Sequence, residues 1–315
     1  MTLVKTLSQK AWIWSFLGMF LVWLATAVYT GGKGSADVIT AALSFATFTV
    51  IVGIGQMFVI TTGPGNVDLS IPSTISLSGA VAMKIMDGSN AMLAIGLLVS
   101  LGCGLVVGMF NYMLIRVLRI PPIIATLSSS FLILSSAIAY GRGLKIKPPP
   151  LLAEFTTAQV LGVPVLAIVI ILFAIVMSVV LNRTLYGRSV LAIGQSMRAA
   201  WLAGINVERI RFMTYVLSAL LAALCGFLLS GFSGGASLNM GQEYLLASIA
   251  VVVIGGTSVA GGKANVPGIW GAAMFMFLLV TMLNTFGASA GIRLILTGLI
   301  IVAVITIAGG DEPQR

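Results

Sequence analysis

Histidine does not occur in this sequence of 315 residues, and cysteine occurs only twice. Without histidine the chain lacks the commonest general base and the commonest metal ligand of proteins. Cys103 and Cys225 both lie inside apolar runs, where a small hydrophobic side chain packs well, so neither a disulfide framework nor a metal site is expected. We therefore expect no catalytic residue, no metal and no cofactor in this chain.

Charged residues are also scarce. They make up 8% of the chain, whereas hydrophobic residues make up 59% and the mean hydropathy is +1.12. A soluble domain of this length would carry far more charge. The net charge of +9 comes from basic residues that lie mostly between apolar runs, where they set membrane orientation rather than bind nucleic acid. The composition indicates an integral membrane protein with no nucleic-acid partner.

Apolar runs of about 18 or more residues recur along the chain, and each is long enough to cross a hydrocarbon core of roughly 30 Å. The runs are continuous rather than alternating, which favours helices over barrel strands. The first run follows a basic start and is too long for the core of a signal peptide, so we expect it to be retained. We predict an all-α, polytopic protein whose single transmembrane domain covers 1–315, with about ten spans at 11–30, 38–61, 71–86, 91–117, 123–140, 163–181, 212–232, 244–256, 266–283 and 292–308.

Two predicted spans, 71–86 and 244–256, are shorter than a full crossing. "TTGPGN" precedes the first and "GGTSVAGG" follows the second. Irregular backbone at membrane depth is tolerated only inside protein or beside water, so short or broken helices point to a transport pathway. Each short span is the third of five, which suggests two five-helix halves related as an inverted repeat.

The distribution of lysine and arginine predicts cytoplasmic N- and C-termini. With ten spans, Arg116, Arg119, the loop 182–211 and Lys263 all fall on the cytoplasmic side. The loop 141–155 is an exception, because it faces outward although it is basic.

The largest polar insertion, 181–212, contains a stretch of good helix formers from Gln195 to Ala203, and Gly204 follows in the place of a C-terminal cap. This pattern predicts a short helix at the cytoplasmic surface. It is either part of an ordinary basic loop that holds topology, or a docking helix for a soluble partner. Docking would use a face of small residues, Ala199, Ala200, Ala203 and Gly204.

The same insertion carries a pattern, G-x-x-x-x-A-A-x-x-x-G-I, at Gly194, Ala199, Ala200, Gly204 and Ile205. It resembles the coupling segment of permease subunits in ribose-type ABC importers. Three further stretches resemble motifs of the same family in order and spacing: "GNVDLSIPS" (65–73), "IPPIIATLSS" (120–129) and "ASIAVVVIGGTSVAGGKANVPGIWGA" (247–272). The resemblance runs from about residue 50 to 305. The chain departs from the family pattern at Pro64, Asn66 and Pro72.

The resemblance implies a bacterial inner-membrane subunit that imports a monosaccharide, a pentose or a hexose, by alternating access. It also implies a second permease subunit, either a copy or a paralogue, one or more cytoplasmic ATP-binding subunits, and a periplasmic sugar-binding protein. The chain contains no G-x-x-x-x-G-K-[ST] phosphate loop, so it is not the ATPase. The energy of ATP would enter through the loop around Arg198. Relatives with the same architecture carry nucleosides or signalling sugars, and these substrates are the alternatives to a monosaccharide.

Asp68 is the one acid of the motif 65–73, and it lies between two strongly apolar stretches. A carboxylate in a membrane costs a few kcal/mol and marks a pathway, a pairing or a proton relay. A proton-coupled secondary transporter is therefore the rival function class. The alternative is a helix cap, because Asp68 directly precedes Leu69-Ser70-Ile71-Pro72.

Other polar residues near the short spans offer groups to a polyhydroxylated solute, although small polar residues also pack between membrane helices. The candidates for the translocation pathway are Asn66, Asp68, Ser70, Thr126, Thr257 and Ser258.

Overall fold

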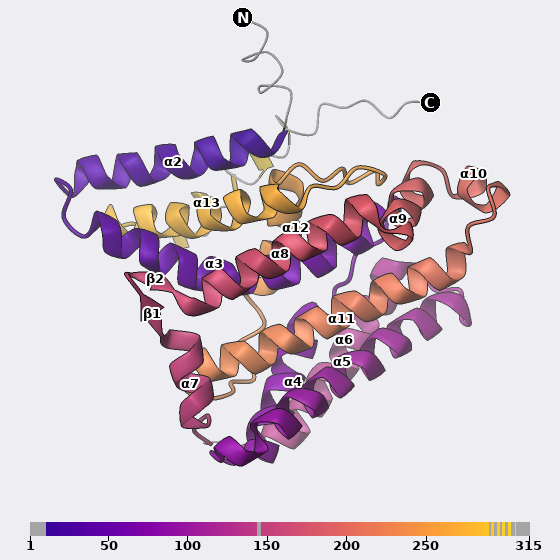
Figure 1. Cartoon of the computed structure of the whole chain (residues 1–315), viewed down its shortest axis with the longest axis horizontal. Helices are drawn as coiled ribbons and strands as arrows, with labels where there is room; N and C mark the ends of the chain where they lie inside the picture. Colours follow the sequence, from indigo (N-terminus) through magenta and orange to yellow (C-terminus); the bar gives the residue numbers. More distant parts are fainter. Residues whose placement is uncertain are drawn as a thin grey trace, which may run out of the picture.

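The computed structural model describes residues 11–143 and 146–289, and residues 291–292, 295–296, 298–299, 302–303 and 306 beyond them. In this part of the chain, helices account for all regular structure except one small β-hairpin. Most of the helices run along one common direction, as expected for a bundle that spans a membrane (Figure 1).

Seven helices are long and apolar enough to cross a membrane. They are α2 (Ala11–Tyr29), α3 (Ser35–Thr61), α5 (Leu93–Arg116), α6 (Pro122–Gly141), α8 (Val165–Arg183), α11 (Val207–Phe232) and α13 (Val266–Thr285). Two shorter apolar helices, α4 (Ile71–Met86) and α12 (Tyr244–Ile254), occupy the two short predicted spans. These helices coincide with nine of the predicted spans to within a few residues. The predicted span 292–308 lies mostly outside the described residues.

The helix starts follow simple local chemistry. Proline stands in the first turn of α4, α6 and α13, where its missing N–H would have no partner within the helix. At the other end of α4, Asp87 adopts a left-handed conformation with φ of 42° and stops the helix. These signals explain why the sequence located α4 without error.

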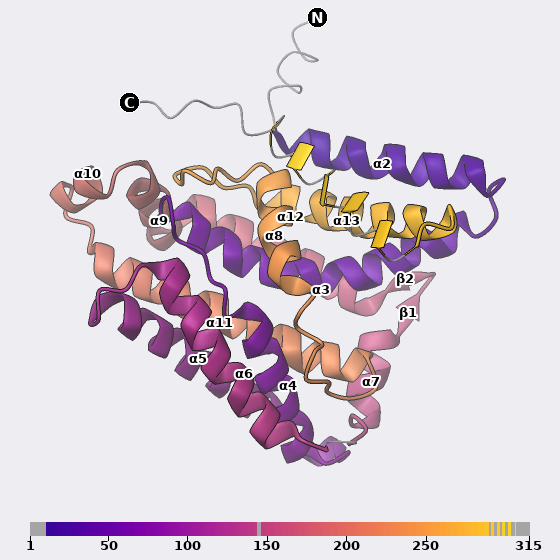
Figure 2. The same cartoon turned by 180° about the vertical axis from the view of Figure 1, so that it is seen from behind.

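Two groups of helices lie side by side. One contains α4, α5, α6 and α11, and the other contains α2, α3, α8, α12 and α13; both views show the separation (Figures 1 and 2). Helices α3 and α11 join the groups through extensive mutual contact. The segment between α3 and α4 thus runs from one group into the other.

Glycines allow the helices of the first group to approach closely. A Cβ atom on Gly104 of α5 would lie 2.6 Å from the Ala219 carbonyl oxygen of α11, and one on Gly226 of α11 would lie 2.3 Å from the Ile75 carbonyl oxygen of α4. Small residues are the usual means of close packing between membrane helices. Helices α4, α5 and α11 therefore form one tightly packed unit.

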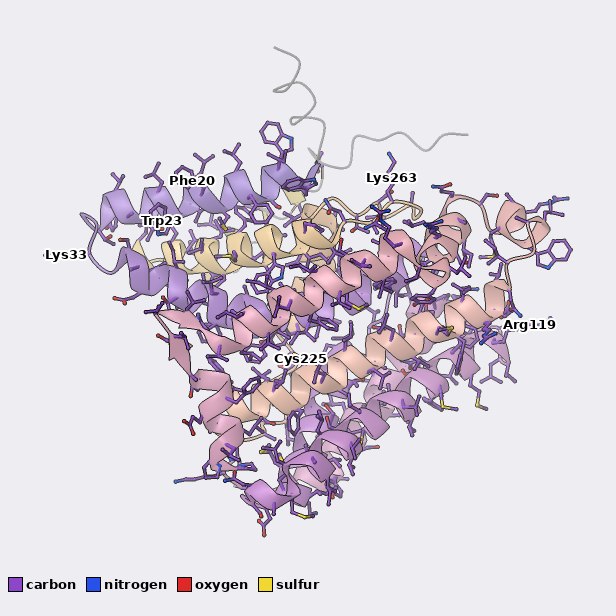
Figure 3. The ribbon with its side chains drawn as sticks, in the orientation of Figure 1. Phe20, Trp23, Lys33, Arg119, Cys225 and Lys263 are labelled. Atoms are coloured by element: carbon purple, nitrogen blue, oxygen red, sulfur yellow. The ribbon has the colours of Figure 1, made fainter. Side chains whose placement is uncertain are left out.

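Short elements mark the two ends of the molecule. The helix α7 (Pro150–Thr157) and the hairpin of β1 (Gln159–Val160) and β2 (Val163–Pro164) lie at one end, and α9 (Leu185–Gln195) and α10 (Met197–Leu202) lie at the other (Figure 1). A turn of 3₁₀ helix, η1 (Asn90–Met92), precedes α5. The sequence analysis did not predict α7, the hairpin or a separate α9. Figure 3 places Lys33 at the α7 end and Arg119 at the α9–α10 end, with Cys225 near the centre.

The outer faces of the peripheral helices are apolar. On α2 the exposed side chains include Trp14, Phe20 and Leu24. Helix α6 exposes isoleucine, leucine and phenylalanine, and α8 exposes isoleucine, leucine and valine. Such a surface would be unstable in water but matches lipid hydrocarbon.

Candidate translocation and coupling sites

The segment 62–70, between α3 and α4, is irregular backbone enclosed by helices. Gly63 and Gly65 adopt positive φ values of 124° and 76°, which lets the chain turn sharply after α3. Beyond this turn the side chains of Asn66, Asp68 and Ser70 are buried. Irregular backbone at this depth is compatible with a membrane only when protein surrounds it.

Asp68 joins three helices. Its Oδ1 accepts hydrogen bonds from the backbone N–H (3.0 Å) and the hydroxyl (2.6 Å) of Ser70, and its Oδ2 accepts one from the Ser218 hydroxyl of α11 (2.7 Å). Its own N–H donates to Oε1 of Gln56 in α3 (3.1 Å). The carboxylate, which is 1% exposed, is thus held by donors from α4 and α11 while its backbone is held by α3.

The prediction that Asp68 caps a helix is wrong in its strict form. The cap position of α4 belongs to Ser70, which makes no side-chain capping bond there. A capping side chain bonds the N–H of the second or third helical residue, whereas Asp68 bonds the N–H of Ser70, two positions after itself. This is the local turn that aspartate commonly forms, and it fixes the entry to α4.

A second chain of hydrogen bonds leads from Ser70 into α5 and α6. The Asn111 amide of α5 donates to the Ser70 hydroxyl (2.7 Å), and the Ser129 hydroxyl of α6 donates to the Asn111 carbonyl oxygen. Thr126 of α6 accepts from the N–H of Leu69 (3.1 Å). Four of the six pathway candidates, Asn66, Asp68, Ser70 and Thr126, therefore meet around one segment.

Asn111 and Ser129 belong to this cluster but were missed in the sequence. Asn111 is the more informative omission, because it lies in the apolar run 91–117, where an amide needs a partner inside the protein. That requirement is the signal that could have identified it.

Asn66 connects segment 62–70 to α11 at a point closer to the start of that helix than Ser218, the partner of Asp68. Its Oδ1 accepts hydrogen bonds from the Arg211 guanidinium (2.8 Å) and the Tyr215 hydroxyl (3.2 Å), while its amide donates to the Gly63 carbonyl oxygen (3.1 Å). Arg211 was predicted from the sequence to be a basic loop residue. Since α11 begins at Val207, five residues before the predicted span, Arg211 lies on the helix instead.

Thr257 and Ser258 lie apart from this cluster. The Thr257 hydroxyl oxygen accepts from the N–H of Asn265 (3.4 Å), and the N–H of Ser258 donates to the Lys263 carbonyl oxygen (3.1 Å). These bonds close the loop 255–265 that follows α12. In the described part of the chain no hydrogen bond links either residue to Asp68.

The loop 255–265 packs instead on the end of α3 and on α9. The N–H of Gly262 donates to the Thr61 carbonyl oxygen (3.0 Å). Gly194 fits into the same contact, since a Cβ atom there would lie 1.9 Å from the Thr61 carbonyl oxygen and 2.3 Å from the Gly262 nitrogen. Gly194 is therefore required for close packing, and it does not belong to an exposed docking face.

The short helix expected between Gln195 and Ala203 is present as α10. The Ser196 hydroxyl caps its start by accepting from the N–H of Ala199 (3.2 Å). At its end Gly204 has a φ of +84°, and the N–H of Ile205 donates to the Ala200 carbonyl oxygen (3.0 Å), as in glycine-terminated helices. The helix is thus defined at both ends by its own sequence.

The two faces of α10 differ. Ala200 is buried against Ile193 and Val207, so it packs inside this chain and cannot belong to the docking face predicted for it. Arg198, Ala199 and Gly204 are exposed. Large apolar side chains stand beside them, with Trp201 67% and Leu202 70% exposed.

A cavity of about 810 Å³ opens between α10 and the adjoining ends of α5 and α11. Trp201, Ile205 and Arg198 line it on one side, and Arg116 and Glu208 line it on the other. Arg116 Nε lies 2.8 Å from Glu208 Oε2, and the Tyr112 hydroxyl donates to the same oxygen (2.6 Å). This end of the molecule therefore presents a cationic and partly apolar recess.

Comparison with known proteins assigns the chain to a family. Residues 38–305 match the model for the permease component of the branched-chain amino acid transport system. The chain belongs to this family of transport permeases. It is thus a multi-pass transport subunit of the bacterial inner membrane and not itself an enzyme. The family match, together with the ribose and fructose import permeases among its relatives, confirms the resemblance noted in the sequence.

Individual relatives cover nearly the whole chain. The chain is 33% identical to the ribose import permease of Bacillus subtilis over 294 residues, which cover 92% of this chain and 90% of that protein. It is 31% identical to the fructose import permease of Rhizobium meliloti, covering 90% and 81%. It is 26% identical to the autoinducer 2 import system permease of Enterobacter, covering 97% and 89%. No solved structure matches the chain.

Proposed function

We propose that this chain is the permease subunit of an ATP-binding cassette importer that carries a monosaccharide, a pentose or a hexose, across the inner membrane by alternating access. The relatives named for ribose and fructose import, similar over most of the chain, support this substrate class. ATP hydrolysis would occur in separate cytoplasmic subunits, and a periplasmic sugar-binding protein would deliver the substrate at the α7 end.

The observation that carries the proposal is the exposed helix α10 at the arginine-rich end of the molecule. It is capped at both ends and presents Trp201 and Leu202 outward. Exposed apolar side chains in an aqueous compartment usually mark a binding surface for a protein partner. We assign this surface to docking of the ATP-binding subunit, with Arg198, Ala199 and Gly204 at its centre.

Asn66, Asp68, Ser70 and Thr126 are proposed to border the translocation pathway. Thr257 and Ser258 would act at its cytoplasmic end, where their loop contacts α3 and α9. A second permease subunit, a copy or a paralogue, would complete the pathway.

The proposed inverted repeat is supported by the two short helices. An irregular segment precedes each of them: 62–70 precedes α4, and 233–243 precedes α12. Each short helix is the third of its five, and the last span of the second half would return the C-terminus to the cytoplasm.

The docking assignment is tested by Ala199→Arg in a complex reconstituted with its ATP-binding subunit and binding protein. A bulky cation at an interface that costs about 1.4 kcal/mol lowers affinity tenfold, so ATP-dependent uptake of radiolabelled ribose and fructose should fall by about tenfold. Ala36→Arg, an exposed alanine at the other end of the molecule, is the matched control and should transport normally. Undiminished uptake by Ala199→Arg would refute docking through α10.

A signalling-sugar importer is the second candidate, and the similarity to the autoinducer 2 import system permease supports it. The binding protein separates the candidates, because its ligand is the substrate of the complex. Calorimetric titration of that protein with ribose, fructose and autoinducer 2 identifies the class directly.

A further inference from the structure

One face of α11 carries a continuous row of polar side chains. Glu208, Arg211, Tyr215 and Ser218 are spaced by three, four and three residues, which places them on the same side of a helix. We call this row the polar stripe of α11. The rest of α11 is mainly apolar, so the stripe needs an explanation beyond membrane insertion.

Every member of the stripe bonds to a residue outside α11, one of them to α5 and three to segment 62–70. Glu208 pairs with Arg116 and Tyr112 of α5, at the edge of the cytoplasmic recess. Arg211 and Tyr215 both donate to Asn66, and Ser218 donates to Asp68. The stripe therefore runs without interruption from the recess beside α10 to the buried carboxylate of segment 62–70.

The connection between α10 and the stripe is short. Four residues, 203–206, separate the last residue of α10 from the first residue of α11. The Asn206 side chain accepts from the N–H of Arg209 (3.0 Å) and caps α11. Because so few residues intervene, a displacement of α10 by a partner would be passed to the first two turns of α11, where Glu208 and Arg211 lie.

The stripe is incompletely satisfied at its centre. Among the described residues, neither Arg211 Nε of the stripe nor Nε2 of the neighbouring Gln56 in α3 has a hydrogen-bond partner, although both atoms are buried. A buried donor without a partner destabilises the arrangement that holds it, and a charged donor does so more strongly. A hydrogen-bond network that contains unpaired donors is less rigid than a fully bonded network, so it changes more readily to another arrangement.

We infer that the polar stripe of α11 transmits movement of α10 to segment 62–70, and that Arg211 and Asn66 are the positioning residues of this link. The inference rests on the proposed function. Because α11 packs tightly on α4 and α5, these three helices can move together. A change of a few tenths of an ångström in the distance from donor to acceptor weakens a hydrogen bond. Movement of the first turn of α11 then releases or re-forms the bonds to Asn66, and this repositions the entry to α4.

The experiment uses the full reconstituted complex and measures sugar molecules taken up per ATP hydrolysed. Arg211→Met should keep basal ATP hydrolysis within twofold of wild type but lower this ratio about tenfold, and Asn66→Ala should lower the ratio by a similar factor. Arg209→Met is the matched control, because it removes an exposed cation from the same turn of α11, and its ratio should be unchanged. Asn66→Asp retains an acceptor for Arg211 and should restore most of the ratio.

Thermal unfolding of each purified complex separates positioning from a merely structural role. A structural role predicts that ATP hydrolysis, uptake and melting temperature fall together, and that outcome would overturn the inference. A normal ratio in Arg211→Met, or an equal loss in Arg209→Met, would also overturn it while leaving the proposed function intact. A wild-type complex with no ATP-dependent uptake would overturn both.

Discussion

Asp68 is enclosed by hydroxyl and amide donors rather than by other acids. Its hydrogen-bond partners in the described chain are Ser70 and Ser218 at the carboxylate and Gln56 at the backbone. This environment suits a fixed acceptor that organises three helices. A proton relay would need a second titratable group in the hydrogen-bonded chain, and the described cluster continues instead through Asn111 and Ser129.

Asp68→Asn is expected to keep ATP-dependent uptake within about twofold of wild type. The amide oxygen can still accept from Ser70, and the amide N–H₂ can donate to the Ser218 hydroxyl oxygen. Asp68→Ala leaves several buried donors unpaired and should destabilise the protein by about 1–3 kcal/mol for each, seen as a lower melting temperature and lost uptake. Uptake assays with and without a protonophore check both variants. Loss of uptake in Asp68→Asn at normal stability would instead favour the proton-coupled transporter.

At the scale of single helices, α5 approaches α11 closely because one of two nearby glycines of α5 faces α11. Gly102 and Gly104 are two residues apart on α5, but a Cβ atom on Gly102 would meet nothing within 4 Å, whereas one on Gly104 would collide with Ala219 and Ala223. The two positions therefore form a natural comparison.

Gly104→Ala is expected to lower stability by about 1–3 kcal/mol, the usual cost of overpacking. Gly102→Ala should be neutral or stabilising by up to about 1 kcal/mol, because alanine favours the helix. Thermal unfolding of the two variants in detergent measures the difference. Equal stability of the two variants would show that α5 does not press on α11 at Gly104.

Prediction from sequence succeeded for elements defined by their own residues. The apolar runs located the spans, and the capping residues Ser196 and Gly204 define α10 within the predicted stretch. The short predicted span 71–86 is present as α4, directly after the irregular segment that holds Asp68. These signals are local, so one sequence contains them.

Prediction failed where partners are distant in the chain. Arg211 bonds to a residue 145 positions away and Ser218 to one 150 positions away, and no local pattern pairs them. Ala200 looked available for docking because its neighbours in sequence are small, but Ile193 and Val207 cover it. Thr257 and Ser258 were proposed for the pathway from their local sequence alone, and the structure adds that their bonds close a loop separate from the Asp68 cluster.

For the whole molecule, the ends differ in charge. The α9–α10 end carries a set of arginines, Arg116, Arg119, Arg183, Arg188 and Arg198. At the α7 end, basic residues such as Lys84 and Lys147 lie among acids such as Asp87 and Glu154; Figure 3 labels Lys33 at this end and Arg119 at the other. Positive residues are retained on the cytoplasmic side of bacterial membranes. The charge distribution therefore agrees with the proposed cytoplasmic position of α10 and of both termini.

Thiol labelling can test this orientation. Lys33→Cys and Trp201→Cys, each in a background with Cys103→Ser and Cys225→Ala, place one exposed thiol at each end. In intact cells treated with a membrane-impermeant maleimide, Lys33→Cys should react and Trp201→Cys should react only after the membrane is opened. The reverse pattern would contradict the proposed orientation.

The glycine contacts between helices also constrain how this chain can change over generations. Backbone meets backbone at Gly104, Gly194 and Gly226, so any side chain there must push two helices apart. The outer faces of α2, α6 and α8 expose apolar side chains, and where such a face meets fluid hydrocarbon, one apolar residue replaces another at little cost. A saturation library selected for growth on the transported sugar should therefore be depleted at these buried glycines and permissive at Phe20 or Leu24. Descendants of this protein would keep the spacing of their helices while the surface exposed to lipid drifts freely.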